Sequence, residues 1–196
     1  MLRPTPAPAP ALRSVLAALG SPTAVSAART PALRAATGPL TPELPLPVHV
    51  LRLSGAPGQT PGTRLVGWRF LIRGGDHAIA AADTMLTPDG WSFSHFFEGP
   101  YVTATERALA QAEALPGTYE PRLLSVPELY MLTLWLRAEP EADGGDPAAE
   151  SADVLVPLAP APPGIAAHRP YPVADLLPVL STRLAPPPLL GSAAPA

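Results

Sequence analysis

The chain has 196 residues and a net charge of −3, with 13 basic and 16 acidic side chains. It holds no cysteine, which excludes disulfides and thiolate metal sites. Residues 45–196 carry nine arginines against 15 acidic side chains, and this balance argues against a nucleic-acid-binding protein, which needs a basic face.

Composition indicates which part of the chain folds. The 30 prolines crowd the first 47 residues and the C-terminal part. Residues 1–44 are therefore expected to be a disordered arm rich in proline, alanine and arginine, and residues 185–196 a disordered tail. A single α+β domain is expected over residues 45–184, with a mobile acidic loop at 138–153. Lysine and asparagine are absent, which indicates a GC-rich genome rather than a need for arginine chemistry.

A four-residue string occurs twice in the arm. Pro-Ala-Leu-Arg stands at residues 10–13 and again at 31–34. In so biased a segment the repeat can be coincidence, but it can also be a pair of docking motifs for a partner protein. Apolar residues in and after the first copy have helical spacing, so this copy would fold as an amphipathic helix on binding. The interaction candidates in the arm are Leu12, Arg13, Leu33 and Arg34.

The arm also bears on localisation. Residues 14–27 follow Arg13 and end in Val-Ser-Ala, but their apolar part is short, so a secretory signal is the weaker reading. The arm is poor in acids, as organellar transit peptides are, which leaves a second alternative. No apolar run reaches the roughly 20 residues that a bilayer span requires. A cytoplasmic protein without a membrane span is expected.

The clearest elements are four strands that follow the arm. Their apolar or alternating patterns cover residues 48–53, 64–73, 76–86 and 91–97. Gly74-Gly75 is expected to form a two-residue hairpin turn, and Thr-Pro-Asp-Gly at 87–90 is expected to form the next turn. The fold class predicted is α+β, with a four-stranded antiparallel β-meander packed by two or three helices.

Two capping boxes suggest helices after the meander. Thr103 and Glu106 form the first box, and Pro116-Gly117 would end that helix. Ser125 and Glu128 form the second box, just before the apolar run at 129–136. Periodicity does not separate a buried helix from a buried strand in that run, and the capping box favours a helix.

The C-terminal part contains two further elements. Residues 154–156 are predicted to form a short strand, at the sheet edge because Pro157 follows. Residues 173–184 are predicted to form a last helix, in which Pro178 would cause a kink.

Pairing the strands across their turns places Asp83 opposite His95, on the sheet face that carries the aromatic residues. A carboxylate beside an imidazole is half of a general-base site, so both are weak catalytic candidates. The alternative is a structural pair in which each group satisfies the hydrogen bond of the other. No nucleophile accompanies the pair, because Ser92 and Ser94 would point to the opposite face.

The aromatic face could also hold a ligand. Trp68, Phe70, Phe93 and Phe97 would line an apolar pocket if the covering helices left one end open. Otherwise these side chains are core.

The other face of the meander carries two arginines. Arg69 and Arg73 would share it with Ala78, Ala80 and Ala82, a surface of small residues that could accept a partner. The simpler interpretation is a solvated face with arginine stems lying over alanines.

No cofactor or metal is expected. The four histidines, at 49, 77, 95 and 168, do not form a ligand pattern, and a metal site needs at least three ligands. The glycines at 55, 58 and 62 match neither a phosphate-binding loop nor a dinucleotide fingerprint.

Three classes of function follow. The first is a non-enzymatic interaction or adaptor protein that docks a protein partner through its arm and domain surface. The second is a small-molecule-binding domain that uses the aromatic face. The third is an enzyme that uses Asp83 and His95, which ranks last because no nucleophile, metal or cofactor site accompanies the pair.

Overall fold

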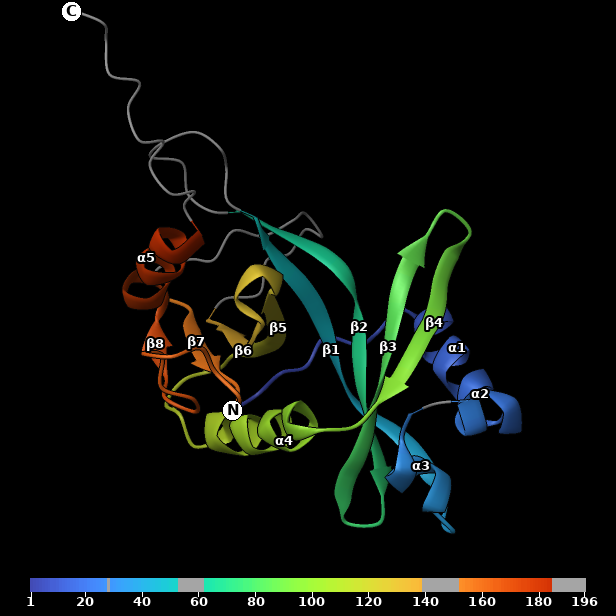
Figure 1. The fold of residues 1–196 in the computed structure, drawn as a ribbon. Helices are drawn as coiled ribbons and strands as arrows, with labels where there is room; N and C mark the ends of the chain where they lie inside the picture. Colours follow the sequence, from blue (N-terminus) through green and yellow to red (C-terminus); the bar gives the residue numbers. More distant parts are fainter. Residues whose placement is uncertain (28, 53–61, 139–151, 185–196) are drawn as a thin grey trace, which may run out of the picture.

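The computed structural model describes residues 1–27, 29–52, 62–138 and 152–184. Within these residues the chain has an α+β fold, an eight-stranded mixed sheet with five α-helices. The strand order is β4-β3-β2-β1-β5-β6-β7-β8 (Figure 1). The predicted tail at 185–196 and nearly all of the predicted mobile loop at 138–153 lie outside the described residues.

Strands β1 to β4, here called the first half-sheet, pair in sequence order and antiparallel. They are β1 (Leu40–Arg52), β2 (Gly62–Gly74), β3 (His77–Thr87) and β4 (Gly90–Phe97). The strands predicted at 64–73, 76–86 and 91–97 are confirmed. The four-stranded architecture is wrong, because β1 also pairs with β5 and continues the sheet. Strand β1 begins eight residues before the predicted start, and a register shift between Glu43 and Leu46 accommodates Pro45.

Strands β5 to β8 form the second half-sheet. They are β5 (Glu120–Val126), β6 (Met131–Arg137), β7 (Val154–Pro157) and β8 (Tyr171–Pro172), with a 3₁₀ turn, η1 (Pro127–Leu129), between β5 and β6. The two half-sheets meet in a short parallel pairing, in which residues 48–50 of β1 lie opposite residues 123–125 of β5. The strand predicted at 154–156 is confirmed as β7, but it is not the edge strand, because β8 pairs with it.

The helix predicted at 129–136 is wrong, because this run forms β6. Every residue of β6 is buried, since Leu132, Leu134 and Leu136 face one apolar cluster while Met131 and Trp135 face another. A strand covered on both faces loses its polar alternation, so the sequence showed no period of two. The residues of the second capping box lie at the end of β5 and in the 3₁₀ turn η1, not at the start of an α-helix.

Helices on both faces make the molecule three layers thick. Helix α4 (Pro100–Glu113) covers one face of both half-sheets, and α5 (Val173–Leu184) covers the opposite face of the second half-sheet. The helix predicted to end before Pro116-Gly117 is confirmed as α4, and the helix predicted at 173–184 is confirmed as α5. The first capping box is wrong, because α4 begins at Pro100 and its N-cap, Gly99, makes no side-chain cap hydrogen bond.

The prediction of a disordered arm is wrong for the described part of residues 1–44. Helices α1 (Ala9–Leu19), α2 (Pro22–Ala27) and α3 (Pro31–Ala35) pack beside β3 and β4 (Figure 1). Ala11 and Val15 are fully buried, and Leu33 is 2% exposed. They belong to the same cluster as Trp68 and Phe70, so the arm is the cover of the aromatic sheet face. Burial against this face supplies the free energy that such short helices lack in isolation.

The N-terminal residues before α1 also contact the sheet and the segment before β5. Leu2 forms a parallel bridge with Tyr119, whose carbonyl accepts a hydrogen bond from the backbone N–H of Arg3 at 2.8 Å. The Thr5 hydroxyl donates to the Glu120 carboxylate. No helix among the described residues is long and apolar enough to cross a membrane.

Candidate functional site

The hairpin register decides which residues share a face. Gly74 pairs with His77, so the turn consists of Gly75 and Asp76 rather than Gly74-Gly75. With a further register shift at Ile72/Arg73, this displacement pairs Trp68 with Thr84 and Arg69 with Asp83. The predicted turn at Gly74-Gly75 is therefore wrong.

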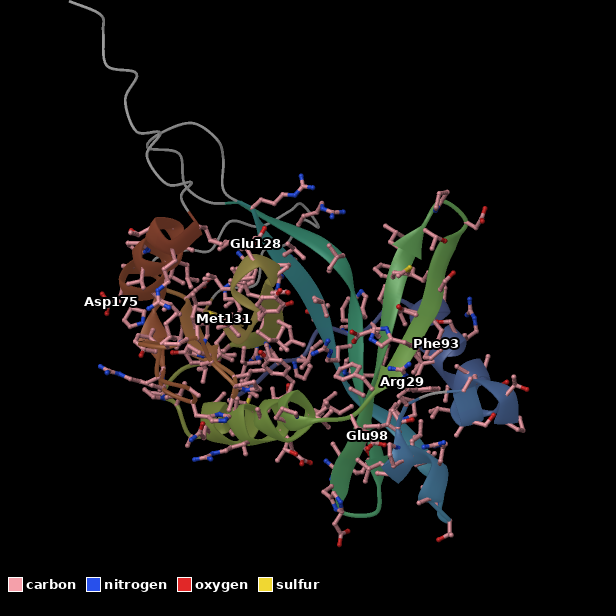
Figure 2. All side chains as sticks on the ribbon, viewed as in Figure 1. Arg29, Phe93, Glu98, Glu128, Met131 and Asp175 are labelled. Carbon is pink, nitrogen blue, oxygen red and sulfur yellow. The ribbon has the colours of Figure 1, made fainter. Side chains whose placement is uncertain are left out.

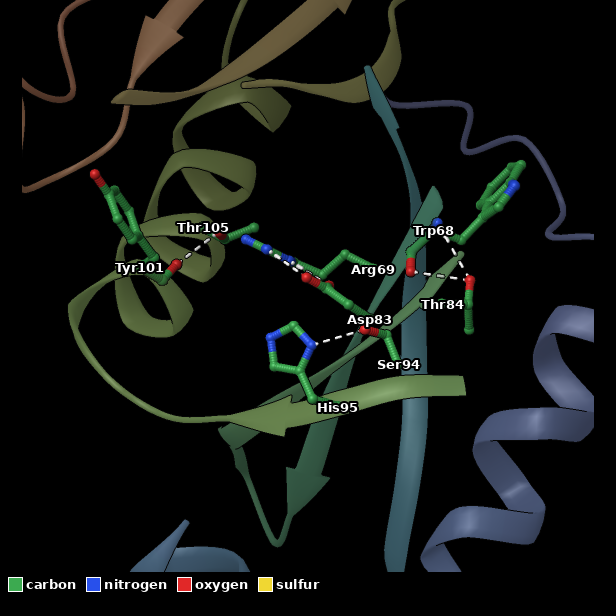
Figure 3. Close-up of polar contacts among 8 residues, drawn as sticks. All are labelled: Trp68, Arg69, Asp83, Thr84, Ser94, His95, Tyr101 and Thr105. Atoms are coloured by element: carbon green, nitrogen blue, oxygen red, sulfur yellow. Dashed lines mark hydrogen bonds and ion pairs between the residues drawn. The ribbon is translucent and has the colours of Figure 1, made fainter. Parts of the chain in front are cut away.

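Asp83 and His95 are cross-strand neighbours, as predicted. They lie on the face of α4, however, and not on the aromatic face, because Asp83 pairs with Arg69 on β2. Both Asp83 carboxylate oxygens accept from Arg69, at 2.8 Å from Nε and 2.8 Å from Nη2 (Figure 3). Asp83 thus orients a guanidinium instead of the imidazole.

His95 contacts a different partner. Its Nδ1 lies 3.0 Å from the Ser94 hydroxyl (Figure 3). A β-bulge between the pairs Asp83/His95 and Thr84/Phe93 leaves Ser94 without a cross-strand partner and changes its direction. A hydroxyl therefore does lie beside His95, and the prediction that no nucleophile accompanies the pair is wrong.

The four predicted pocket residues divide between the two faces. Trp68 and Phe70 are buried under the arm helices, and Phe93 packs against the same cluster. Phe97 lies on the opposite face, with the Arg69 guanidinium 4.4 Å from its ring centroid. The arm helices, which the sequence did not reveal as a cover, pack over Trp68 and Phe70.

Arg69 and Arg73 both lie in ion pairs on the face of α4. Arg73 Nε donates to Glu43 at 2.9 Å, and Arg73 Nη2 lies 3.6 Å from Glu106 on α4. Their predicted neighbours Ala80 and Ala82 belong to the opposite face, in the cluster under the arm helices. The expected surface, on which the two arginines would share one face with Ala78, Ala80 and Ala82, therefore does not form.

The arm residues predicted as interaction candidates have mixed exposure. Leu33 is buried and Leu12 packs against the same cluster, whereas Arg13 and Arg34 are exposed. Glu98, at the end of β4, accepts hydrogen bonds from the backbone N–H groups of Ala32 and Leu33 at 2.7 and 3.2 Å, and so caps α3 (Figure 2). The second Pro-Ala-Leu-Arg copy is thus docked on its own chain.

An open pocket lies where the two half-sheets meet, on the side of α4. Its volume is about 460 Å³. We call it the Arg69 pocket, and it is lined by Arg69, His95, Phe97, Tyr101, Ser125, Pro127, Tyr130, Met131 and Leu132. The first half-sheet supplies one wall, η1 with β5 and β6 supplies another, and α4 contributes Tyr101. Residues far apart in the sequence therefore converge on it.

Tyr101 links the walls of the Arg69 pocket. Its hydroxyl lies 2.7 Å from the Tyr130 carbonyl oxygen and 3.1 Å from that of Pro160. Desolvation raises the pKa of Tyr101 above 10.0, and the positive charge of Arg69 opposes this shift. The phenol is therefore a neutral hydrogen-bond donor at physiological pH and holds the turn before β6 against α4.

Tyr130 forms the rim of the pocket and was missed by the sequence analysis, as were Tyr101 and Ser125. The side chain of Tyr130 is 90% exposed, and its backbone has a φ of 49° in the left-handed region. The exposed tyrosine follows from a turn that reverses the chain at this residue, whereas the sequence analysis treated it as part of a helix.

A Tyr101→Phe variant tests the role of this hydroxyl. We expect a loss of about 1 kcal/mol in the free energy of unfolding at neutral pH, from the lost hydrogen bond. Because the folded-state pKa is raised, the unfolded chain ionises first as the pH rises above 10, so the contribution of Tyr101 to stability declines there and is complete below pH 10. Urea unfolding at pH 7 and 10.5 should show a smaller alkaline loss for the variant. Equal losses in both proteins would contradict this role.

A second pocket lies between α4 and β1, with a volume of about 250 Å³. Its charged lining residues include Arg73 and Glu106, which pair with each other. Its volume is smaller than that of most ligand pockets, and its Arg73 already forms ion pairs with the carboxylates of Glu43 and Glu106. The Arg69 pocket is the better candidate.

The histidines are scattered over the fold. His49 is 3% exposed and lies edge-on to Trp135, at a centroid distance of 5.4 Å. His77 is exposed at the β2–β3 turn, and His168 lies in the segment between β7 and β8. In the described part of the chain, no group of three or more His, Cys, Asp or Glu side chains could hold a metal ion.

No protein-family model, curated protein or solved structure matches the chain.

Proposed function

We propose that the protein is a non-enzymatic binding protein that holds a small molecule in the Arg69 pocket. The observation that carries the proposal is the lining of this pocket. Its volume of about 460 Å³ falls in the range of ligand sites, and aromatic and apolar walls surround a few polar groups. Phe97, Tyr101 and Tyr130 supply flat apolar surface, while Arg69, His95 and Ser125 supply hydrogen-bonding groups.

Catalysis by Asp83 and His95 has less support. A general base is normally oriented by a carboxylate on its second nitrogen, and Asp83 is held by Arg69 instead. Ser94 is hydrogen-bonded to His95, but both lie on an exposed strand edge rather than in an enclosed site that excludes water. A role in binding is compatible with both contacts.

A protein-docking function stays a second proposal, with support from one other feature. Met85 and Leu86, at the end of β3, are 45% and 60% exposed. Docking through the arm has less support, because a partner would have to replace the burial of Val15 and Leu33 before it could use them. A cytoplasmic location stays a prediction.

A matched pair of variants tests the pocket. Tyr130 and Leu86 are both highly exposed, so Tyr130→Ala and Leu86→Ala should each leave the melting temperature nearly unchanged. A fragment library screened by ligand-observed NMR should give hits whose binding Tyr130→Ala weakens about tenfold or more, because an aromatic wall is lost. Leu86→Ala should bind the same hits with unchanged affinity.

Ligand-induced stabilisation provides a second readout. A fragment at 100 times its Kd should raise the free energy of unfolding of the wild type by about 2.7 kcal/mol. Fragments that bind both variants equally well would place the binding site elsewhere, and a library without hits would remove the support for a small-molecule function.

A further inference from the structure

We infer that the ligand of the Arg69 pocket is a small aromatic anion, such as an aryl carboxylate. This inference rests on the proposed function and specifies its ligand class. Two observations carry it, the charge of the lining and the stacked arrangement of one wall.

The lining contains groups that donate to an anion and no carboxylate that would repel one. The polar side chains that line it belong to Arg69, His95, Ser125, Tyr101 and Tyr130. Asp83 stands behind Arg69 and does not line the pocket. An anion entering this pocket meets Arg69 and His95 on the first half-sheet and the Ser125 hydroxyl on β5.

Arg69 is held in a fixed orientation. Asp83 binds its Nε and Nη2, and the side chains of the pair are only 13% and 20% exposed. The guanidinium also lies over the ring of Phe97. Its Nη1 makes no hydrogen bond with any residue that the structure describes, so two N–H donors remain for a ligand at a preorganised position. Asp83 offsets part of the arginine charge, so the pair is expected to give selectivity more than high affinity.

His95 extends the same wall. Its ring centroid is 5.6 Å from that of Phe97, so the guanidinium and the imidazole both lie next to the phenyl ring. Ser94 occupies Nδ1 of His95, which leaves Nε2 as the second group able to donate to a carboxylate. Two donors that border the same phenyl ring suit the carboxylate of an aromatic anion, whose ring can pack beside them.

The facing wall suits the aromatic body of such a ligand. Pro127, Tyr130, Met131 and Leu132 supply apolar and polarisable surface from η1 and β6. Aromatic side chains pack well against rings, and Tyr130 is 90% exposed. The carboxylate is therefore assigned to Arg69 and His95, and the ring is assigned to the side of Tyr130.

Three naphthalene compounds that differ in charge test the inference. They are 2-naphthoate, 2-naphthalenemethanol and 2-naphthylmethylammonium, titrated into the full ¹⁵N-labelled chain and followed by amide chemical shifts. We expect 2-naphthoate to bind at least about tenfold more tightly than the alcohol, as a charge-assisted hydrogen bond provides, and the cation to bind most weakly. The shifts should centre on residues 95–101 and 130–132.

Variants identify the groups responsible. Arg69→Gln alone would leave Asp83 unpaired, so the first variant is the double substitution Arg69→Gln/Asp83→Asn. The second variant is His95→Gln, at an exposed site. Both should lose most of the preference for the anion and keep the affinity for the alcohol. Arg64→Gln, an exposed arginine on the same strand outside this pocket, should change neither.

The outcomes separate the two proposals. If the alcohol or the cation binds as tightly as the anion at these residues, the anion inference is overturned and the binding function stands. If none of the three compounds shifts a residue of the pocket, both the inference and the proposed function lose their basis. An anion preference that survives in both variants would overturn the assignment of the carboxylate to Arg69 and His95.

Discussion

Removal of residues 1–38, which contain α1, α2 and α3, is expected to prevent the remaining chain from forming a stable monomer. The deletion exposes Trp68, Phe70, Ile72 and Phe96, each 5% exposed or less in the intact fold. An apolar sheet face of this kind drives aggregation when its cover is lost. We expect little soluble protein, or a melting transition that is broad or absent in circular dichroism.

Point variants in α1 provide a sharper form of the same test. Val15 is fully buried, whereas its neighbour Leu16 is 48% exposed. Val15→Asp should lower the free energy of unfolding by about 3 kcal/mol or more, because it buries an unpaired charge. Leu16→Asp, with the same charge one residue further on, should change it by less than about 0.5 kcal/mol.

These results would distinguish an arm that covers the sheet from an arm that serves only as a docking handle. A docking handle predicts a stable fold after deletion and similar urea midpoints for Val15→Asp and Leu16→Asp. Unchanged stability in the deletion protein would contradict the packing of α1 and α3 on the first half-sheet.

Trp135→Ala is expected to be the most destabilising single truncation in the second half-sheet. Trp135 is fully buried, and its indole Nε1 donates to Asp153 Oδ2 at 2.7 Å. His49 lies against it edge-on, so the side chain connects β6 with β1. We expect a loss of about 3–5 kcal/mol in the free energy of unfolding, measured by urea denaturation.

The control for Trp135 is Trp91→Ala. Trp91 is only partly buried, near the tip of the β3–β4 hairpin, so its removal leaves a smaller cavity. The loss should be less than half that of Trp135→Ala. Comparable losses at the two sites would show that β6 is not the centre of the second core.

The local sequence was sufficient to predict the elements that have a clear hydrophobic pattern or a turn motif. Apolar or alternating patterns predicted β2 to β4, and Pro116-Gly117 marked the end of α4. The adjacency of Asp83 and His95 was also predictable, since the β3–β4 hairpin is local. The β-bulge at Ile72/Arg73 nevertheless moved both side chains to the other face, because a register shift of one residue reverses the side to which each residue of a strand points.

The candidate site was much less predictable. Arg69, His95 and Phe97 were singled out, but Tyr101, Ser125 and Tyr130 were not, since they come from elements 30 to 60 residues away from Arg69 in the sequence. Their convergence depends on the parallel pairing of β1 with β5, which no local signal announces. The helix predicted at 129–136 also concealed the turn that exposes Tyr130.

By itself, the sequence determined the α+β class, the hairpins of β2 to β4, the helices α4 and α5, and the exclusion of disulfides. The tertiary structure alone decided that the arm folds, that β6 is a strand, and that the two half-sheets form walls of the Arg69 pocket. The physical reason is the same in each case. Short helices and doubly buried strands gain their stability from apolar surfaces remote in the sequence, and local propensity does not record those surfaces.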